Sequence, residues 1–327
     1  MSEFKDGSIY VPYENRYGNE SIVYFTRDLS AAGIMKVYDR VKDVIGGRVA
    51  IKVHTGEEHG PNIIPPAWVR EFMEKESREA RIIETNTYYE WARYTTEQHR
   101  KTLEINGWTD FTDVDILDED GTAMLPVHGG KWFTEMSVGD HLLSYDSMIT
   151  LTHFKGHSLG GFGGSNKNIG IGCADGRIGK KMIHTNEDGM WGVVEEELME
   201  KITESTKSVI DYFGKQVVYV NVLRNMSVSC DCEGVDAEPV VTPNVGILAS
   251  VDILAADQAS VDMVAAMKEE DHHDLMERMS SRHGFRQLSY MKEMGMGNDR
   301  YVLIDVDHND ARITAADAVE GVVPFEG

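Results

Sequence analysis

The chain has 327 residues, of which 41% are hydrophobic and 27% charged, so it can build one large domain or two smaller ones around a sizeable core. Its 55 acidic and 32 basic residues give a net charge of −23. Sequence-independent nucleic-acid binding and docking on anionic membranes both need basic surface, so we expect no nucleic-acid and no membrane partner. The polar N-terminus and the lack of a long apolar run predict neither a secretory signal nor a membrane span. Three cysteines are a poor disulfide framework, which favours a reducing cytoplasm.

The first half of the chain alternates apolar runs with helical patterns. Short runs rich in Val and Ile predict buried strands at residues 48–54 and 80–87. Helical periodicity predicts helices at 65–80, which begins with Pro, and at 96–107, which ends at a Gly stop signal. The segment FTDVDILDEDG predicts a further strand and turn, and residues 142–154 the next long strand.

The second half continues in the same style. The predicted elements are a long helix at 193–214, a strand at 215–223, a strand feeding a helix at 244–267, short helices at 273–284 and 286–297, and a strand at 301–307. The tail to Gly327 is expected to be weakly structured. Repeated strand–helix–strand units favour an α/β fold with mostly parallel sheets flanked by helices, in two halves with a cleft between them. The predicted domains are 1–190, which carries the site, and 191–327, which packs on it.

Residues 149–184 are the most informative stretch of the chain. His153, Lys155 and His157 occupy alternate positions at the end of an apolar strand, and a glycine-rich segment follows. Glycine loses more backbone freedom on folding than any other residue, so this many glycines predict that backbone approaches a ligand closely. Backbone N–H groups there would face an anion, with a lysine as a charge clamp or a covalent anchor. The predicted cofactor-binding group is Lys167, Gly161, Gly163, Gly164 and Asn168.

Polar residues follow the predicted strands at the points where the strands end. In open α/β sheets ligands lie beyond the carboxyl ends of the strands, so we expect these residues to converge. They are His54, Asn86, His153, His157, Asn225, Cys230 and Asp252. Histidine can transfer protons near neutral pH, so the predicted catalytic residues are His157, His54 and Lys155. For His54 the alternative is an ordinary solvated loop that also contains Glu57, Glu58 and His59.

The two cysteines of the Cys230-Asp-Cys232 segment place two thiols on one side of an extended backbone. Ligation of a metal or an iron–sulfur cluster needs further ligands, which Cys173, His153, His157 or His184 can supply. The predicted metal-binding group is His184, His153, Cys230 and Cys232. The alternative is that the cysteines are structural or incidental.

Several segments together resemble the domain-of-unknown-function family 362. They are VAIKVHTGEEHGPNIIPP, DSMITLTHFKGHSLGGFGGSNKNIGIG, GKKMIH, VNVLRNMSVSCDC and GILASVDILAADQASVDMV. Many relatives are named iron–sulfur proteins because a ferredoxin-like insert follows the MIH segment. Here TNEDGMWGVV runs directly from His184 into the long helix, so the insert is absent. Cys230 and Cys232 are then what remains for an iron–sulfur or metal site.

The segment HSLGGFGGSNK with the later MIH is also similar to part of the nickel-pincer lactate racemase family. This resemblance implies proton transfer for His157, binding of the pincer nucleotide for Lys167 and nickel ligation for His184. The chain departs from that family after the first strand, where it has His54-Thr55-Gly56-Glu57 in place of an Arg-containing motif. The departure leaves the cofactor open.

Two functions of different class are therefore expected. The first is a metal- or cofactor-dependent enzyme acting on a small anionic substrate, isomerase- or racemase-like or an oxidoreductase, with a site built from His157, Lys167 and His184. The second is a non-catalytic binding or carrier protein for a metal, an iron–sulfur cluster or a cofactor. The cofactor candidates are a divalent metal (nickel or iron) and an iron–sulfur cluster. A separate electron donor and a homo-oligomeric state are both compatible with the sequence.

Overall fold

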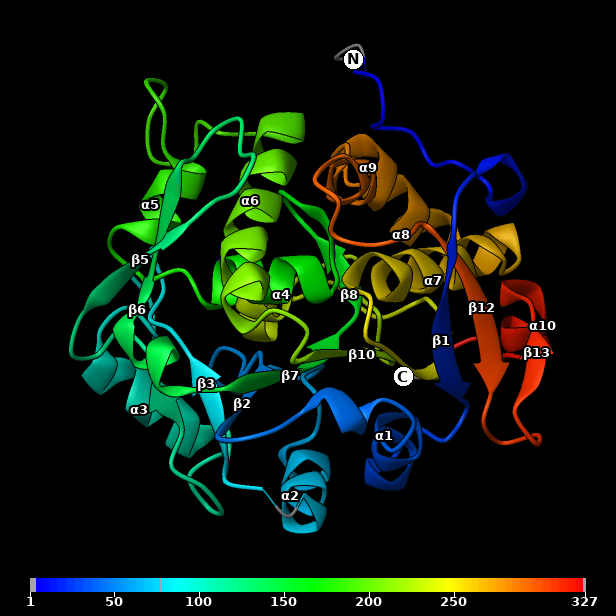
Figure 1. Cartoon of the computed structure of the whole chain (residues 1–327), viewed down its shortest axis with the longest axis horizontal. Coiled ribbons are helices and arrows are strands. Elements are labelled where there is room, and N and C mark those ends of the chain that lie inside the picture. The colour runs from blue at the N-terminus through cyan, green and yellow to red at the C-terminus, as the bar shows by residue number, and fades with distance from the viewer. Residues whose placement is uncertain (1–3, 77, 326–327) are drawn as a thin grey trace.

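The computed structural model of the protein describes residues 4–76 and 78–325. A sheet of nine described strands crosses the middle of the molecule in the order β13-β12-β1-β11-β10-β7-β2-β3-β4 (Figure 1). The strands are β1 (Glu20–Thr26), β2 (Val49–Val53), β3 (Ala80–Glu84), β4 (Asp115–Ile116), β7 (Ser147–His153), β10 (Val217–Leu223), β11 (Gly246–Ser250), β12 (Arg300–Asp305) and β13 (Ala311–Ile313).

Most neighbouring strands of this sheet are parallel. The run β10-β7-β2-β3-β4 is parallel throughout, and β1 is parallel to β12. Strand β11 is antiparallel to both of its neighbours, and β13 is antiparallel to β12. The predicted α/β fold with a mostly parallel sheet between helices is therefore confirmed.

Helices cover both faces of the sheet (Figure 1). Below it in this view lie α1 (Ala31–Tyr38), α2 (Pro66–Lys75) and α3 (Thr96–Ile105). Above it lie α4 (Ser165–Gly172), α5 (Gly179–His184), α6 (Glu195–Phe213), α7 (Ile253–Ala265), α8 (Glu269–Ser281) and α9 (Arg286–Glu293). The short helix α10 (Ala315–Val319) packs beside α7. Each face has its own hydrophobic core, so the central strands are buried on both sides.

The central strands show why the apolar runs of the sequence fold as they do. Every residue of β7 and β10 is buried, as expected for parallel strands with helices on both faces. The predicted helix 193–214 forms as α6, whose first turn carries three glutamates that suit the positive end of the helix dipole. It ends at Gly214, whose φ of 62° favours glycine.

Two sequence interpretations are wrong. The tail is not weakly structured, because β13 and α10 form within it; residues 326 and 327 lie outside the described residues. Asp252 does not join the other strand-end residues, because β11 runs antiparallel to β10 and therefore ends at the opposite edge of the sheet. Its side chain instead accepts a hydrogen bond from the Ala255 N–H (2.9 Å) at the start of α7.

The boundary at residues 190 and 191 stays a prediction. One sheet takes strands from both ranges, since β10 to β13 follow the boundary and β1 to β7 precede it. The predicted helix 65–80 is shorter than expected: α2 ends at Lys75, and residue 77 lies outside the described residues.

Two hairpins stand apart from the main sheet. The first pairs β5 (Thr122–Pro126) with β6 (Glu135–Gly139). The second pairs β8 (Lys155–His157) with β9 (Gly161–Gly163), directly after β7. The β8–β9 hairpin thus projects Lys155 and His157 beyond the carboxyl end of the central strand.

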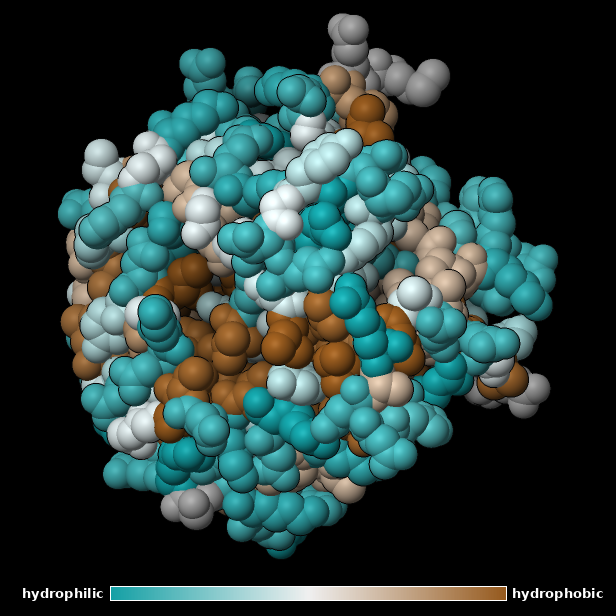
Figure 2. All heavy atoms as spheres, turned by 45° about the vertical axis from the view of Figure 1, so that its right-hand side comes forward, coloured by the Kyte–Doolittle hydropathy of each residue, from teal (hydrophilic) through white to brown (hydrophobic). Residues whose placement is uncertain are grey.

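Figure 2 shows hydrophilic side chains over most of one face of the molecule and hydrophobic side chains gathered across its middle. Among the described residues, no helix combines the length and the apolar character needed to cross a bilayer.

Candidate functional site

A cavity of about 440 Å³ lies where β2, β3 and β7 end. His54 follows β2, Thr85 follows β3, and His153 closes β7; all three line the cavity. Of the predicted site residues, all except Gly161 and Cys230 line it. The carboxyl edge of the parallel strands therefore gathers most of these residues, as the topology of open α/β sheets favours. Of the strand-end residues expected to converge, Asn86 and Asn225 are not among the described residues that line the cavity.

The cavity lining is cationic although the chain is strongly acidic. Its cations are Lys52, Arg93, Lys155, Lys167 and Lys180, whereas Glu84 is the acidic residue among the described lining residues. A cleft lined by one sign of charge focuses the field and raises the local concentration of oppositely charged ligands. The lining therefore favours an anionic ligand.

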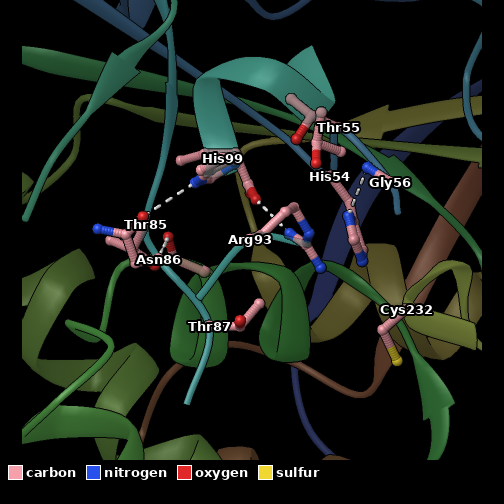
Figure 3. Close-up of polar contacts among 12 residues, drawn as sticks. His54, Thr55, Gly56, Thr85, Asn86, Thr87, Arg93, His99 and Cys232 are labelled. Carbon is pink, nitrogen blue, oxygen red and sulfur yellow. Dashed lines mark hydrogen bonds and ion pairs between the residues drawn. The ribbon is translucent and has the colours of Figure 1, made fainter. Parts of the chain in front are cut away.

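Two of these cations belong to a buried network of ion pairs at the ends of β2 and β3. Lys52 pairs with Glu84, and Arg93 pairs with Glu84 (3.0 Å) and with Glu57 (2.8 Å). Burial alone would raise the pKa of Glu84, but the charges of Lys52 and its other basic neighbours outweigh it and lower this pKa to about 2. Figure 3 shows Arg93 beside His54, and Cys232 lines the same cavity as these two residues. The network fixes the ends of β2 and β3 relative to each other.

Lys155 is also paired. Its ammonium lies 2.8 Å from Asp231 at the start of the short 3-10 helix Asp231–Asp236. Burial opposes the charged form of Lys155, but Asp231 outweighs it and raises the lysine's pKa. Lys155 is therefore a paired cation of the cavity wall, and its catalytic role stays a prediction.

Lys167 differs from the other cations of the cavity. It lies on α4, is half-buried, and makes no hydrogen bond or ion pair with any residue that the structure describes. Its aliphatic stem runs past Gly160 and Gly163. A lysine held this way keeps its full hydrogen-bonding capacity for a ligand.

Lys180 is a cavity residue that the sequence interpretation missed. Its ammonium donates hydrogen bonds to Thr85 Oγ1 (2.6 Å), Asn86 O (2.7 Å) and Ala174 O (2.8 Å). Burial lowers its pKa to about 8. It stands four residues before His184 on α5, so the helical spacing in GKKMIH was the available signal.

The histidines of the cavity differ in the ring nitrogen that is free. His54 Nδ1 accepts the Gly56 N–H (3.0 Å), and His157 Nδ1 accepts the N–H groups of Leu159 (3.1 Å) and Gly160 (2.8 Å). Burial lowers the pKa of both rings, which favours their neutral forms. Because Nδ1 accepts, the proton of each neutral ring lies on Nε2. Both rings are therefore N–H donors at Nε2.

His184 has the opposite arrangement. Its Nδ1 lies 2.8 Å from the carbonyl oxygen of Lys180, which can only accept, so this nitrogen carries the proton. Burial lowers the pKa of His184 to about 4. Its Nε2 lone pair is thus free to bind a metal or a proton, the arrangement typical of a ligating histidine. Tyr88 and Trp191 pack around its ring, with ring centroids 6.4 and 5.0 Å away.

His153 has both ring nitrogens engaged. Nδ1 lies 2.9 Å from the Asp231 carboxylate, and Nε2 lies 2.7 Å from the Arg224 carbonyl oxygen. A metal role for His153 stays a prediction and would require one of these contacts to break.

The two cysteines of the predicted pair lie together, with one histidine. Ligand atoms of His157, Cys230 and Cys232 all lie within 4.8 Å of one another. The hydrogen bond from Cys232 and the nearby Lys167 and His157 lower the pKa of Cys230 well below its usual value, whereas that of Cys232 is raised. Cys173 belongs to the hydrophobic core, where burial raises its pKa to about 12.

The glycines of the segment serve different purposes. Gly161 has a φ of +74°, and a Cβ there would lie 2.7 Å from Gly284 Cα. A Cβ on Gly164 would lie 2.5 Å from Asp257, whose carboxylate accepts the first N–H groups of α4. At these two glycines, other parts of the protein occupy the space that a side chain would fill. The anion at the start of α4 is the carboxylate of Asp257. A Cβ on Gly163 would make ordinary van der Waals contact with the side chains of Lys155 (3.6 Å) and Lys167 (3.8 Å).

Replacing Gly161 and Gly163 with alanine should separate these purposes. Gly161→Ala forces a side chain into a left-handed backbone and a backbone contact, so we expect a loss of about 2 kcal/mol or more in the free energy of unfolding. Gly163→Ala should unfold like the native chain but narrow the cavity between Lys155 and Lys167. Urea unfolding measures both variants. Equal stability of the two would contradict the packing described for Gly161.

Comparison with solved structures finds distant similarities. The lactate racemase apoprotein from Thermoanaerobacterium thermosaccharolyticum is 14% identical, covering 96% of this chain and 93% of that chain with a TM-score of 0.41. A crystal structure of a protein from Thermotoga maritima is 15% identical, covering 57% of this chain and 49% of that chain with a TM-score of 0.36. A comparison with curated proteins gave no match.

Comparison with protein families gives a match over residues 49–262, which spans β2 to α7 and therefore every predicted site residue. The family resemblance seen in the sequence is confirmed. The chain belongs to the family described as Domain of unknown function (DUF362).

Proposed function

We propose that this protein is a metal- or cofactor-dependent enzyme that acts on a small anionic substrate in the cavity beyond β2, β3 and β7. Its chemistry is that of an isomerase or racemase, or of an oxidoreductase. The observation that carries the proposal is the ammonium of Lys167, which has no hydrogen bond or ion pair with the described residues and lies in a cationic cavity. The same cavity holds the neutral rings of His157 and His184. An unpaired cation among neutral acid–base groups suits binding and proton transfer together.

The free donor or acceptor atoms of each residue determine its proposed role. Lys167 binds the anionic group of the substrate or of a cofactor. His184 offers a lone pair at Nε2, so it ligates a metal or takes a proton. His157 carries its proton on Nε2, so the neutral ring donates a hydrogen bond there to negative charge that develops on a substrate. Isomerisation next to a carboxylate needs a base that takes and returns a proton and a donor that stabilises the charge left behind.

The donor atoms near the cavity also suit a transition metal. Imidazole nitrogen and thiolate sulfur are ligands of nickel, iron and zinc, whereas magnesium and calcium prefer oxygen. A bound divalent metal would act as a Lewis acid on a substrate oxygen. His184 is the ligand proposed on the cavity side.

A second function is favoured by a specific observation. His157, Cys230 and Cys232 lie within 4.8 Å of one another, which is a compact set of soft donors. This arrangement supports the alternative of a protein that stores or delivers a metal, an iron–sulfur cluster or a cofactor without turnover.

Anaerobically prepared protein tests both functions. Elemental analysis, an absorption spectrum and intact mass should reveal a bound metal, cluster or covalent adduct in the native chain. His184→Ala should lose the metal, and the exposed His128→Ala should keep it. Exchange of the α-proton of 2-hydroxy acids in D₂O, followed by NMR, then separates enzyme from carrier.

The outcomes are distinct. Metal lost from His184→Ala together with catalysed α-proton exchange or turnover by the native chain supports the enzyme. Metal retained in His184→Ala but lost from Cys230→Ser, without turnover, supports the carrier. Native protein without metal, chromophore or adduct would contradict both.

A further inference from the structure

The Cys230-Asp-Cys232 segment forms a dithiol at the wall of the cavity. Both cysteines are free, and their sulfur atoms lie within 4.8 Å of each other. Cys232 lines the cavity, whereas Cys230 lies behind it with 1% of its surface exposed. A small molecule in the cavity therefore meets Cys232 first.

The sulfur of Cys230 lies close to the second thiol and to one histidine. The Cys232 backbone N–H donates a hydrogen bond to it at 3.4 Å. Ligand atoms of Cys232 and His157 both lie within 4.8 Å of it. The two thiols are therefore near neighbours at the wall of the cavity.

Metal binding by the cysteines together with His157 would change the hydrogen bonding of the ring. Its Nδ1 lone pair accepts two N–H groups, so a metal ligand at Nε2 would require the proton of that nitrogen to leave. A reaction of the two thiols with each other requires no such change.

We propose that Cys230 and Cys232 are a redox-active dithiol that reduces small disulfides reaching it through the cavity and closes into a Cys230–Cys232 disulfide. This inference goes beyond the proposed function, since it needs neither the metal nor the anionic substrate. The chemical class of its substrate is a low-molecular-weight disulfide.

The backbone permits the bond. Consecutive Cα atoms are about 3.8 Å apart, so residues two positions apart lie within roughly 5 to 7 Å of each other. Disulfides usually span Cα separations of about 4.4 to 6.8 Å. The two sulfur atoms start within 4.8 Å of each other, and rotation about the Cα–Cβ bonds is the motion that brings them closer.

The reaction balances within the pair and its substrate. Each cysteine begins as a thiol. Cys232 loses its proton and attacks one sulfur of the small disulfide; a new S–S bond forms, the old one breaks, and one thiolate leaves and takes up a proton. Cys230 then loses its proton and attacks Cys232 Sγ, which releases the second half of the small disulfide as a thiolate that is protonated in turn. Two cysteine sulfurs are oxidised and one disulfide is reduced to two thiols.

Reduced, metal-free protein mixed with oxidised glutathione tests this proposal by intact mass. The native chain should lose the mass of two hydrogen atoms and retain no glutathione, and peptide mapping should place the link between residues 230 and 232. Cys230→Ser should retain one glutathione, trapped on Cys232. Cys232→Ser should react about tenfold or more slowly, because its remaining thiol is buried. Cys173→Ala should close like the native chain.

Two outcomes would overturn the dithiol. One is a native chain that stays fully reduced under conditions that oxidise its unfolded form, and the other is stable glutathione on the native chain without closure. Metal analysis of the untreated sample keeps this test separate from that of the proposed function. A disulfide that closes while metal remains bound supports the dithiol. The metal content then bears only on the proposed metal- or cofactor-dependent function.

Discussion

Lys167→Ala is expected to weaken binding of an anionic ligand by about 10- to 100-fold while leaving the melting temperature nearly unchanged. A hydrogen bond to a charged group is worth about 1.5 to 3 kcal/mol, which corresponds to this range. Stability should hold because Lys167 makes no hydrogen bond or ion pair with the described residues, so its removal breaks no contact of the fold.

Isothermal titration calorimetry with inorganic phosphate and a panel of 2-hydroxy carboxylates measures the effect. Lys181→Ala is the matched control, since it removes an equal charge from an exposed position on α5. An equal loss of affinity in both variants would show that the effect comes from the overall charge and not from a contact with Lys167. A large drop in the melting temperature of Lys167→Ala would instead make Lys167 part of the core.

Glu84→Gln is expected to cost about 3 to 5 kcal/mol of unfolding free energy, the largest stability effect among these substitutions. Removing one partner of a buried ion pair leaves an uncompensated charge, and here Lys52 and Arg93 both lose their shared partner. Urea unfolding measures the loss. Glu74→Ala breaks the exposed pair with Arg70 and should leave the unfolding free energy nearly unchanged.

The same carboxylate predicts a pH dependence. The pKa of Glu84 is lowered to about 2, whereas an unfolded glutamate titrates near about 4.3. The stabilisation is therefore complete above about pH 4.3 and is lost as the pH falls toward 2. Native protein should lose stability over this window more steeply than Glu84→Gln. Parallel curves for the two proteins would show that Glu84 is not ionised in the fold.

Much of the fold could be predicted because its central strands are continuous apolar runs. β7 and β10 are buried on both faces, so their sequences carry Val, Ile and Leu without polar alternation. The orientation of β11 was not readable, because a five-residue apolar strand looks the same in either direction. The prediction therefore placed Asp252 at the wrong edge of the sheet, because it assumed that β11 runs parallel to its neighbours.

The candidate site was predicted best where its residues are close together in the sequence. His153, Lys155 and His157 had to appear together, since they end one strand and form the next hairpin strand. The meaning of the glycines was not readable, because Gly284 and Asp257, which occupy the space in front of Gly161 and Gly164, come from distant parts of the chain. Lys180 was missed because its role depends on the three oxygen atoms that fold around it.

The pairing of β1 with β12 has a consequence for how the chain folds as it is made. Glu20 pairs with Arg300 and Phe25 with Asp305, so a strand that leaves the ribosome early receives its parallel neighbour only near the end of synthesis. Its other neighbour, β11, also arrives late. Until then β1 has a free edge, and free edges recruit other chains. Contacts between positions so far apart also form slowly. The β1 side of the sheet is therefore where a nascent chain most needs protection by chaperones.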